Sequence, residues 1–253
     1  MLKKEKYEIK FFLNLHRVLN EKFELSCEII DEFDINLKDV DETYIQFIDT
    51  KNRDIYTQGL ILRNRIKREE NACELTYKKR YEIINDDIQG ALEKAKEDGF
   101  VKDKHEFNVE IDWGLTDKIL NIVYKPDKQP QLSGLELPSV ETLREMFFNN
   151  GPQIFFNSGK EIINQSVVYG PVFSRKFKGI FKNKEVNLEI WSMAECKEPI
   201  VEISLEKFKS EEKDEANQYY NELKELLSTK KVNEGWILKG KFSKTDWVMK
   251  KCK

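Results

Sequence analysis

The residues of this chain best placed to do chemistry are cations that recur at every second position in two neighbouring segments. They are Arg63, Arg65 and Lys67 in residues 60–68, and Lys78 and Arg80, together with Thr76, in residues 73–81. Alternate residues of a β-strand point to the same side, so two adjacent strands would present a dense grid of positive charge. Like charges held this close repel one another. An anion such as a polyphosphate, or a matching set of carboxylates, must therefore lie against them.

Carboxylates recur with the same period in other segments. They are Glu8 in residues 5–13, Glu106 and Glu110 in residues 105–112, Glu189 in residues 184–191, and Glu202 and Glu206 in residues 199–206. The opposite faces of these segments are apolar, which fits an antiparallel sheet with one face in water. It also fits a barrel that keeps its charges inside, and a barrel of about eight strands has room for one small ligand. Acids and bases around that lumen would hold a metal ion and an oligophosphate together.

The remaining segments predict a mixture of strands and short helices. Further strands are expected in residues 44–50, 167–178 and 236–249, and helices in residues 87–98, 139–148 and 211–228. Ser139 is expected to cap the second of these helices. No break in composition and no repeat divides the chain, so we expect an α+β fold in which residues 1–253 form one domain.

Composition excludes several classes of function. Charged residues make up 35% of the chain, above the usual share of about 25%, yet the net charge is only −3. A balanced chain of this kind is not expected to bind nucleic acid, because nucleic-acid binders are basic. No apolar run reaches the roughly 20 residues of a membrane span, and the N-terminus lacks the apolar segment of a signal peptide. The four cysteines are scattered and form no CxxC pair, so reduced thiols in a cytoplasmic protein are expected.

Short motifs occur in order along most of the chain. They are KYEIK at 6–10, FIDT at 47–50, LRNR at 62–65, LTYK at 75–78, KHEFNV at 104–109, Arg175, EPIVEISLE at 198–206, and Ser243 with Lys244. In this ordered set the chain resembles the CYTH superfamily, the triphosphate tunnel metalloenzymes. The resemblance implies an antiparallel closed β-barrel of about eight strands, forming a tunnel, with helices packed outside.

The resemblance also implies roles for individual side chains. The phosphate-binding residues would be Lys10, Arg63, Arg65, Lys78, Arg175 and Lys176. The catalytic residues would be Glu106, Glu206 and Lys244. Glu8, Glu202 and Glu206 would hold Mg²⁺ or Mn²⁺.

Two departures from the family pattern bear on catalysis. Lys6 stands where the family has the first glutamate of its opening motif, and Ser204 stands where the late acidic strand has its middle acid. Mg²⁺ normally takes only one or two protein carboxylates, so the remaining acids would still suffice. The expected function is metal-dependent hydrolysis of inorganic triphosphate or of a small organic triphosphate such as thiamine triphosphate. The alternatives are nucleotide cyclisation of the adenylyl cyclase type and non-catalytic binding of polyphosphate or a nucleotide.

Overall fold

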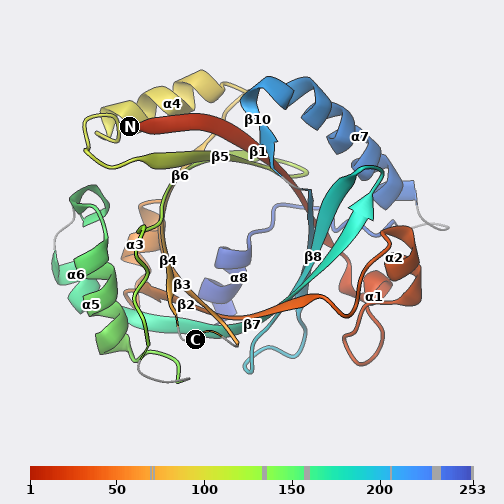
Figure 1. The fold of residues 1–253 in the computed structure, drawn as a ribbon, viewed down its shortest axis with the longest axis horizontal. Helices are drawn as coiled ribbons and strands as arrows, with labels where there is room; N and C mark the ends of the chain where they lie inside the picture. The colour runs from red at the N-terminus through yellow and green to blue at the C-terminus, as the bar shows by residue number, and fades with distance from the viewer. Residues whose placement is uncertain are drawn as a thin grey trace.

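The computed structural model describes residues 1–68, 70, 72–132, 136–156, 160–205, 207–229 and 235–251. Within these residues nine strands pair edge to edge into a closed barrel, seen end-on in Figure 1. Their order around the barrel is β1-β5-β6-β4-β3-β2-β7-β8-β9, and the pairing of β9 with β1 closes the ring. The strands are β1 (Leu2–Leu13), β2 (Val40–Asp49), β3 (Leu60–Lys67), β4 (Glu74–Glu82), β5 (Phe107–Trp113), β6 (Lys118–Tyr124), β7 (Val167–Phe181), β8 (Lys184–Ser192) and β9 (Ile200–Leu205).

The closed barrel is confirmed, with two differences in detail. The described chain supplies nine barrel strands rather than about eight, and β1 pairs with β5 in parallel while the other neighbours are antiparallel. The strand β6 was not predicted. Its sequence KILNIVY is mostly apolar, and its cavity-facing residues are Ile119, Asn121 and Val123, so it lacks the alternation of charged and apolar residues seen on β1, β3 and β5.

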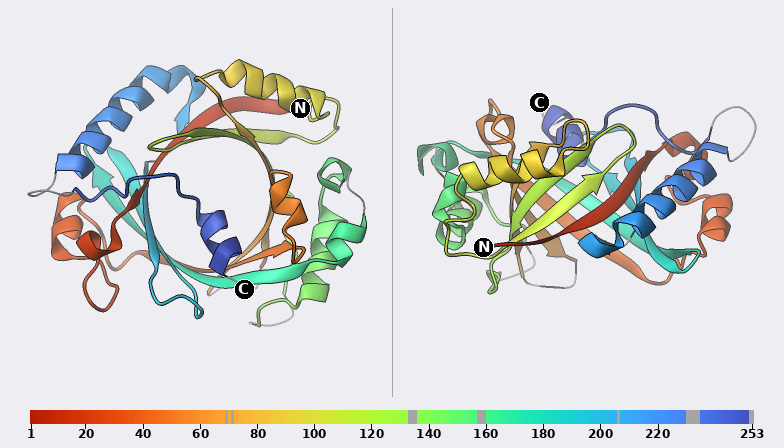
Figure 2. Two further views of the ribbon diagram at one scale, coloured as in Figure 1. Left: turned by 180° about the vertical axis from the view of Figure 1, so that it is seen from behind. Right: turned by 90° about the horizontal axis from the view of Figure 1, so that it is seen from above.

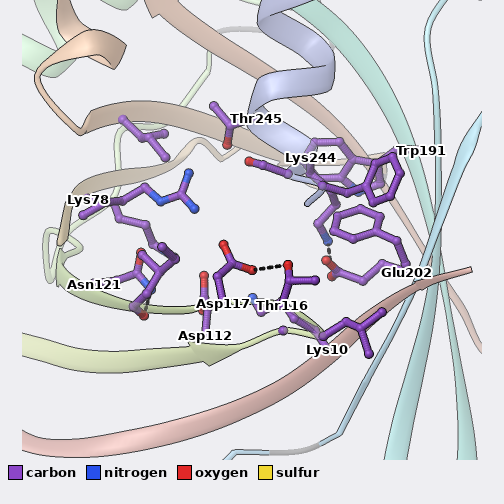
Figure 3. Close-up of a pocket in the computed structure, with 18 of the residues that line it drawn as sticks. Lys10, Lys78, Asp112, Thr116, Asp117, Asn121, Trp191, Glu202, Lys244 and Thr245 are labelled. Carbon is purple, nitrogen blue, oxygen red and sulfur yellow. Dashed lines mark hydrogen bonds and ion pairs between the residues drawn. The ribbon is translucent and has the colours of Figure 1, made fainter. Parts of the chain in front are cut away.

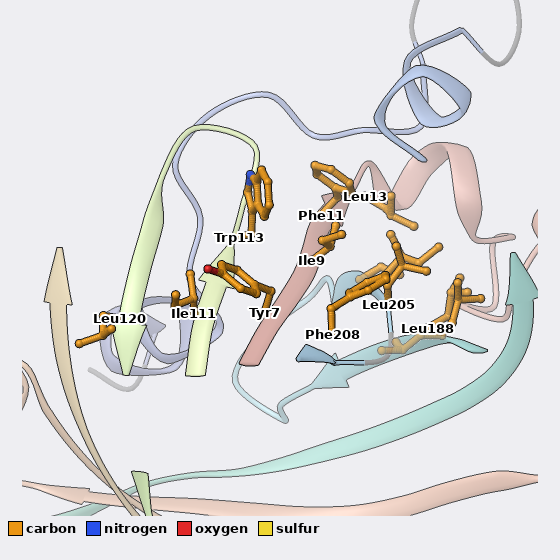
Figure 4. Close-up of a cluster of buried hydrophobic side chains, with 14 of the residues drawn as sticks. Tyr7, Ile9, Phe11, Leu13, Ile111, Trp113, Leu120, Leu188, Leu205 and Phe208 are labelled. Carbon is orange, nitrogen blue, oxygen red and sulfur yellow. The ribbon is translucent and has the colours of Figure 1, made fainter. Parts of the chain in front are cut away.

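The outward faces of the strands form the main hydrophobic core under the helices. Tyr7, Ile9, Phe11 and Leu13 lie along the outer face of β1 in Figure 4. Helix α7 (Lys213–Thr229) covers this face, and its Tyr220 stacks on Trp113 with ring centroids 4.9 Å apart. Burial of such apolar surface stabilises by about 25 cal/mol per Å², so it fixes which strand faces point outward and leaves the polar faces inside.

The other helices also lie outside the barrel wall or at its ends. They are α1 (Leu15–Val18), α2 (Cys27–Glu32), α3 (Asp54–Thr57), α4 (Ile88–Glu97), α5 (Val140–Asn150), α6 (Lys160–Asn164) and α8 (Lys244–Lys251). Two short 3₁₀ turns, η1 (Gln153–Phe156) and η2 (Ser210–Glu212), and the two-residue strand β10 (Phe208–Lys209) complete the elements of the described residues. Ser139 caps α5 as expected, because its hydroxyl accepts a hydrogen bond from the Thr142 amide at 3.3 Å.

The C-terminal segment differs from its prediction. The strand expected in residues 236–249 is a loop followed by α8, which lies across one end of the barrel in Figures 1 and 2. Ser243 accepts a hydrogen bond from the Asp246 amide at 3.4 Å, which starts the helix, and Val248 and Met249 are buried against the barrel. These tertiary contacts outweigh the strand-like pattern of the tail. No helix in the described ranges is long and apolar enough to cross a membrane.

Candidate functional site: a charged tunnel

The polar strand faces line two connected cavities inside the barrel. The larger has a volume of about 500 Å³, and the smaller, beside α8, has a volume of about 130 Å³. Residues that line both cavities mark where they meet. These residues are Lys10, Arg63, Thr76, Lys78, Glu202 and Lys244. We call the two cavities together the charged tunnel.

Strand register explains why the two cationic segments meet in this tunnel. In the β3–β4 pair Arg63 lies opposite Thr76, and Arg65 lies opposite Glu74. These four positions share one side of the sheet, because directly opposed residues of an antiparallel pair point the same way. The predicted grid of cations is therefore present, and it faces the lumen.

Lys244 lies at the centre of one group of buried charges. Its ammonium contacts the carboxylate of Glu189. It also contacts Glu202 at 2.7 Å and lies 4.8 Å from the ring centroid of Trp191, as Figure 3 shows. Ser174 donates a further hydrogen bond to Glu189 at 2.7 Å. Burial opposes ionisation of Glu189, but the cations of Lys244 and Arg65 outweigh it and hold the pKa of this carboxyl well below its usual range.

A second group of buried charges surrounds Lys10 and Lys78. Lys10 contacts Asp112 at 3.0 Å and Glu8 at 3.3 Å, and Lys78 lies 3.8 Å from Glu110. Burial raises the pKa of both Asp112 and Glu110, yet the neighbouring lysines lower the pKa of Glu110 to about 2 and that of Asp112 well below its usual range. Burial lowers the pKa of Lys78. These acids are therefore ionised at neutral pH and offset part of the positive charge.

Arg63 lacks the ion pair that Lys10, Arg65, Lys78 and Lys244 each form with a carboxylate. Its guanidinium contacts the Thr76 hydroxyl at 3.4 Å, its Nε is buried without a hydrogen-bond partner, and none of the described carboxylates lies at ion-pair distance. Burial and the adjacent charge of Arg65 lower its pKa to about 10, so it stays protonated at neutral pH. A half-buried cation whose Nε is shielded from water and unpaired costs free energy unless a ligand supplies a counter-ion. Arg63 therefore indicates an anion-binding position.

The structure brings most of the predicted site residues into this tunnel. They are Glu8, Lys10, Arg63, Arg65, Lys78, Lys176, Glu202 and Lys244. Glu206 lies outside the described residues. Ser204 lines the tunnel, whereas Lys6 is exposed and lies opposite Lys209 and Glu110 in the pairing of β1 with its neighbours.

Two predicted site residues, Arg175 and Glu106, lie outside the charged tunnel. Arg175 follows Ser174 and precedes Lys176, which both line the tunnel, so strand alternation turns Arg175 to the outer side, where it donates to the Phe23 carbonyl at 2.9 Å. Glu106 precedes the first residue of β5, its side chain is 62% exposed, and it pairs with Lys3 at 3.3 Å. Neither side chain reaches the tunnel cations in this arrangement.

Several tunnel residues have no predicted role. Glu110 and Glu189 belong to the alternating carboxylates expected around a lumen, but the sequence assigns neither of them a ligand or catalytic role. Asp112 shares the strand face of Glu110, so the same alternation could have placed it in the lumen. Asn121, by contrast, lies on the unpredicted strand β6, and no pattern in the sequence marked it.

Metal-ligating side chains do not form a preformed cage in the described part of the chain. No group of three His, Cys, Asp or Glu side chains there is arranged to hold a metal ion. Glu8 and Glu202 both line the tunnel, but each contacts a lysine ammonium. Any metal bound by these two carboxylates would take its remaining ligands from a substrate and from water.

No family model and no curated protein matches the sequence. Solved structures match over most of the chain. A Hippeastrum protein described as a candidate adenylyl cyclase with a dominant triphosphatase activity is 13% identical over 86% of each chain, with a TM-score of 0.47. A candidate adenylate cyclase from Bacillus halodurans is 14% identical over 91% of this chain and 93% of its own, with a TM-score of 0.48. The PH1819 protein of Pyrococcus horikoshii is 16% identical over 90% of this chain and 92% of its own, with a TM-score of 0.43.

The family resemblance rests on the fold and the motifs of the chain itself. Its barrel is closed, and the LRNR and LTYK motifs lie on adjacent strands with Arg63, Arg65 and Lys78 facing the lumen. In architecture and motif order the chain resembles the CYTH superfamily. Most of the residues matched to CYTH motifs converge on the charged tunnel, and Arg175 and Glu106 depart from that pattern.

The buried carboxylates predict that acid destabilises the fold. Because the pKa values of Glu110, Asp112 and Glu189 are lowered on folding, their stabilising effect is complete above the unfolded pKa of about 4. It is lost as the pH falls through the folded values. We expect the thermal midpoint, followed by circular dichroism, to drop between about pH 5 and pH 2. Glu110→Gln should make the thermal midpoint depend less on pH over this range. Glu106→Gln, at an exposed position, should leave the pH dependence unchanged. The same pH dependence in both variants would show that Glu110 is not one of the carboxylates whose pKa falls on folding.

Proposed function

We propose that the charged tunnel binds a triphosphate and hydrolyses it. The observation that carries this proposal is Arg63, a half-buried guanidinium whose Nε is shielded from water and which pairs with none of the described carboxylates, beside Arg65 and at the junction of the two cavities. A triphosphate carries several negative charges, and it would supply the counter-ion that Arg63 lacks. The substrate would be inorganic triphosphate or a small organic triphosphate such as thiamine triphosphate.

Binding would rest on cations from three strands. Arg63 and Arg65 on β3 can each make two hydrogen bonds to phosphate oxygens, as guanidinium groups commonly do. Lys78 on β4 and Lys10 on β1 add point charges from adjoining parts of the wall. Because these cations are fixed and partly shielded from water, they stabilise charge on the transferring phosphoryl group without reorganising during the reaction.

The attacking water needs a carboxylate that accepts one of its hydrogen bonds. Glu106 is too far outside the lumen for this role in the present arrangement, and Glu206 is not described. Asp112 is the tunnel carboxylate we assign to it, since it is ionised and lies beside Lys10, which would contact the substrate. Lys244 would hold Glu189 and Glu202 in place and offer its ammonium to a phosphate oxygen.

Divalent metal dependence is part of the proposal. Glu8 and Glu202 offer the hard oxygen ligands that Mg²⁺ and Mn²⁺ prefer, and phosphate oxygens would complete the shell. An ion held there would neutralise charge on the phosphate oxygens when bound. Because both carboxylates are paired with lysines, we expect weak metal binding to the free protein and stronger binding once triphosphate is present.

Phosphate release tests the proposal. The protein is incubated with inorganic triphosphate, thiamine triphosphate and ATP, each with Mg²⁺, with Mn²⁺ and with EDTA. Release of phosphate that requires the metal supports hydrolysis, and Asp112→Asn should reduce the rate by roughly 100-fold or more if this side chain positions the water. Absence of binding to all three compounds would refute the triphosphate site.

A non-catalytic role is the second candidate. The observation that favours it is that Glu8 and Glu202 each already contact an ammonium group, which competes with a metal ion. Tight binding of triphosphate without phosphate release at any metal concentration would establish this role in place of hydrolysis.

A further inference from the structure

The FIDT motif at 47–50 supplies no polar side chain to the charged tunnel, since neither Asp49 nor Thr50 lines either cavity. Asp49 is nevertheless only 1% exposed. Its carboxylate accepts hydrogen bonds from the backbone amides of Thr50, Ile55 and Tyr56, at 2.7, 2.9 and 2.8 Å. Two of these amides belong to α3, so Asp49 fixes this short helix against the end of β2.

Helix α3, fixed in this way, holds one side chain against α8. The Tyr56 hydroxyl lies 3.3 Å from a carboxylate oxygen of Asp246 and donates a hydrogen bond to it. Burial and the charge of Asp246 raise the pKa of Tyr56, so the phenol keeps this proton at neutral pH. Asp246 lies in the first turn of α8, and Lys244 is the first residue of the same helix. The contacts that begin at Asp49 therefore lead to the turn that carries the tunnel lysine.

The hydrogen bond from Tyr56 ties the first turn of α8 to the barrel wall. The cap at Ser243 and the ion pair of Lys250 with Asp246 join residues of one segment, so they shape the helix without placing it relative to the barrel. Val248 is buried against the barrel, but apolar packing is non-directional and leaves the rotation of the helix less well defined. A hydrogen bond, in contrast, depends on distance and angle.

The position of the Lys244 ammonium is sensitive to the rotation of this turn. It lies between carboxylates on two strands, Glu189 on β8 and Glu202 on β9, and over the ring of Trp191 (Figure 3). Charge-assisted hydrogen bonds are short and weaken steeply when their geometry is disturbed. A small rotation of the first turn would therefore weaken the contact of the ammonium with one or both acids.

We propose that Tyr56 is a positioning residue for Lys244. By holding Asp246, it sets the first turn of α8 and keeps the ammonium between Glu189 and Glu202. Neither Tyr56 nor Asp246 lines the charged tunnel, so Tyr56 acts there only through the helix. The inference rests on the proposed function for its catalytic consequence, because Lys244 is the group that would contact a phosphate oxygen.

The response of unfolding to Mg²⁺ tests the inference without requiring activity. Urea midpoints are measured with and without Mg²⁺ in the unaltered protein, in Tyr56→Phe and in Lys244→Met. An ammonium displaced from Glu202 competes less with the metal. Tyr56→Phe should therefore bind Mg²⁺ about five-fold or more tightly than the unaltered protein, at the lower end of the usual coupling between two sites. In Lys244→Met, adding Tyr56→Phe should leave the Mg²⁺ response unchanged, because the competing ammonium is already absent.

Two further positions provide controls. Tyr81 donates a hydrogen bond to Asp98 at 2.6 Å and so joins β4 to the end of α4. Tyr81→Phe therefore removes the same kind of hydrogen bond away from α8, and its Mg²⁺ response should match that of the unaltered protein. Asp246→Asn keeps an oxygen that accepts from Tyr56, so it should preserve the unaltered response. Asp246→Ala removes that acceptor and should behave as Tyr56→Phe does.

A double-mutant cycle without Mg²⁺ gives a second measurement. The effects of Tyr56→Phe and Lys244→Met on the free energy of unfolding should be non-additive, whereas those of Tyr81→Phe and Lys244→Met should add. Additive effects for both tyrosines overturn the inference, and so does an equal Mg²⁺ response in Tyr56→Phe and Tyr81→Phe. If the unaltered protein binds no triphosphate but the coupling is present, the proposed function is removed and the positioning of Lys244 by Tyr56 stands. Triphosphate hydrolysis without the coupling gives the reverse conclusion.

Discussion

Arg63→Ala should weaken the binding of inorganic triphosphate by at least about ten-fold. Hydrogen bonds to charged groups contribute about 1.5–3 kcal/mol, and 1.4 kcal/mol corresponds to ten-fold in affinity. Stability should change little, because no described carboxylate is ion-paired with Arg63 and its charge is opposed by burial and by Arg65. Calorimetry gives the affinity, and thermal unfolding verifies the fold.

Arg175→Ala is the matched control for this prediction. The CYTH resemblance assigns Arg175 to phosphate, whereas the structure turns its guanidinium to the Phe23 carbonyl outside the tunnel. If Arg175→Ala keeps its affinity for inorganic triphosphate while Arg63→Ala loses much of it, the placement of Arg63 inside the tunnel and of Arg175 outside it is supported. The reverse result would show that β7 pairs in a register shifted by one residue, because such a slip exchanges the two strand faces.

The inward placement of Arg63, Arg65 and Lys78 could be predicted from the sequence. Their segments alternate strictly between charged and apolar residues, and burial of one face then decides the direction of the other. The same rule could not decide whether Arg175 or Lys176 points into the lumen. Adjacent residues of a strand point to opposite faces, so one of these two cations faces inward in either register. The pairing of β7 with β2 decides it, since Lys176 lies opposite Asp41, 3.3 Å from its carboxylate.

The α8 end of the tunnel could not be predicted in this way. Strand β6 has no charged residue at its three cavity-facing positions, so nothing in its sequence distinguishes a lumen strand from a core strand. The strand predicted in residues 236–249 is wrong, because α8 is short and is held by tertiary contacts of Val248 and Met249 that the local pattern does not show. Both errors concern elements whose conformation depends on contacts distant in sequence.

Lys244→Met should destabilise the protein more than any other single change in the tunnel. The ammonium of Lys244 is the shared counter-ion of Glu189 and Glu202, and the side chains of these two acids are only 14% and 5% exposed. Removing one partner of a buried ion pair leaves an uncompensated charge and typically costs about 3–5 kcal/mol. Urea unfolding should therefore show a large fall in the midpoint at pH 7.

The control for this change is Lys250→Met on the same helix. Lys250 pairs with Asp246, but its side chain is 64% exposed, so its loss should cost less than about 1 kcal/mol. Adding Glu202→Gln to Lys244→Met should recover part of the lost stability, because it removes the carboxylate that loses its described ion-pair partner, whereas Glu189 keeps Arg65 at 4.0 Å. Equal effects of the two lysine variants would show that Lys244 is not a buried counter-ion.

Divalent ions distinguish the structural role of Lys244 from its proposed role near substrate. Without the ammonium, Mg²⁺ can take its place beside Glu202 and Glu189, and a ligand that binds only the folded state raises its stability. Mg²⁺ should therefore raise the unfolding midpoint of Lys244→Met more than that of the unaltered protein or of Lys250→Met. A Mg²⁺ effect of the same size in all three proteins would mean that the lysine does not compete with metal. The ion pair of Lys244 with Glu202 would then not weaken metal binding to the free protein, contrary to the expectation above.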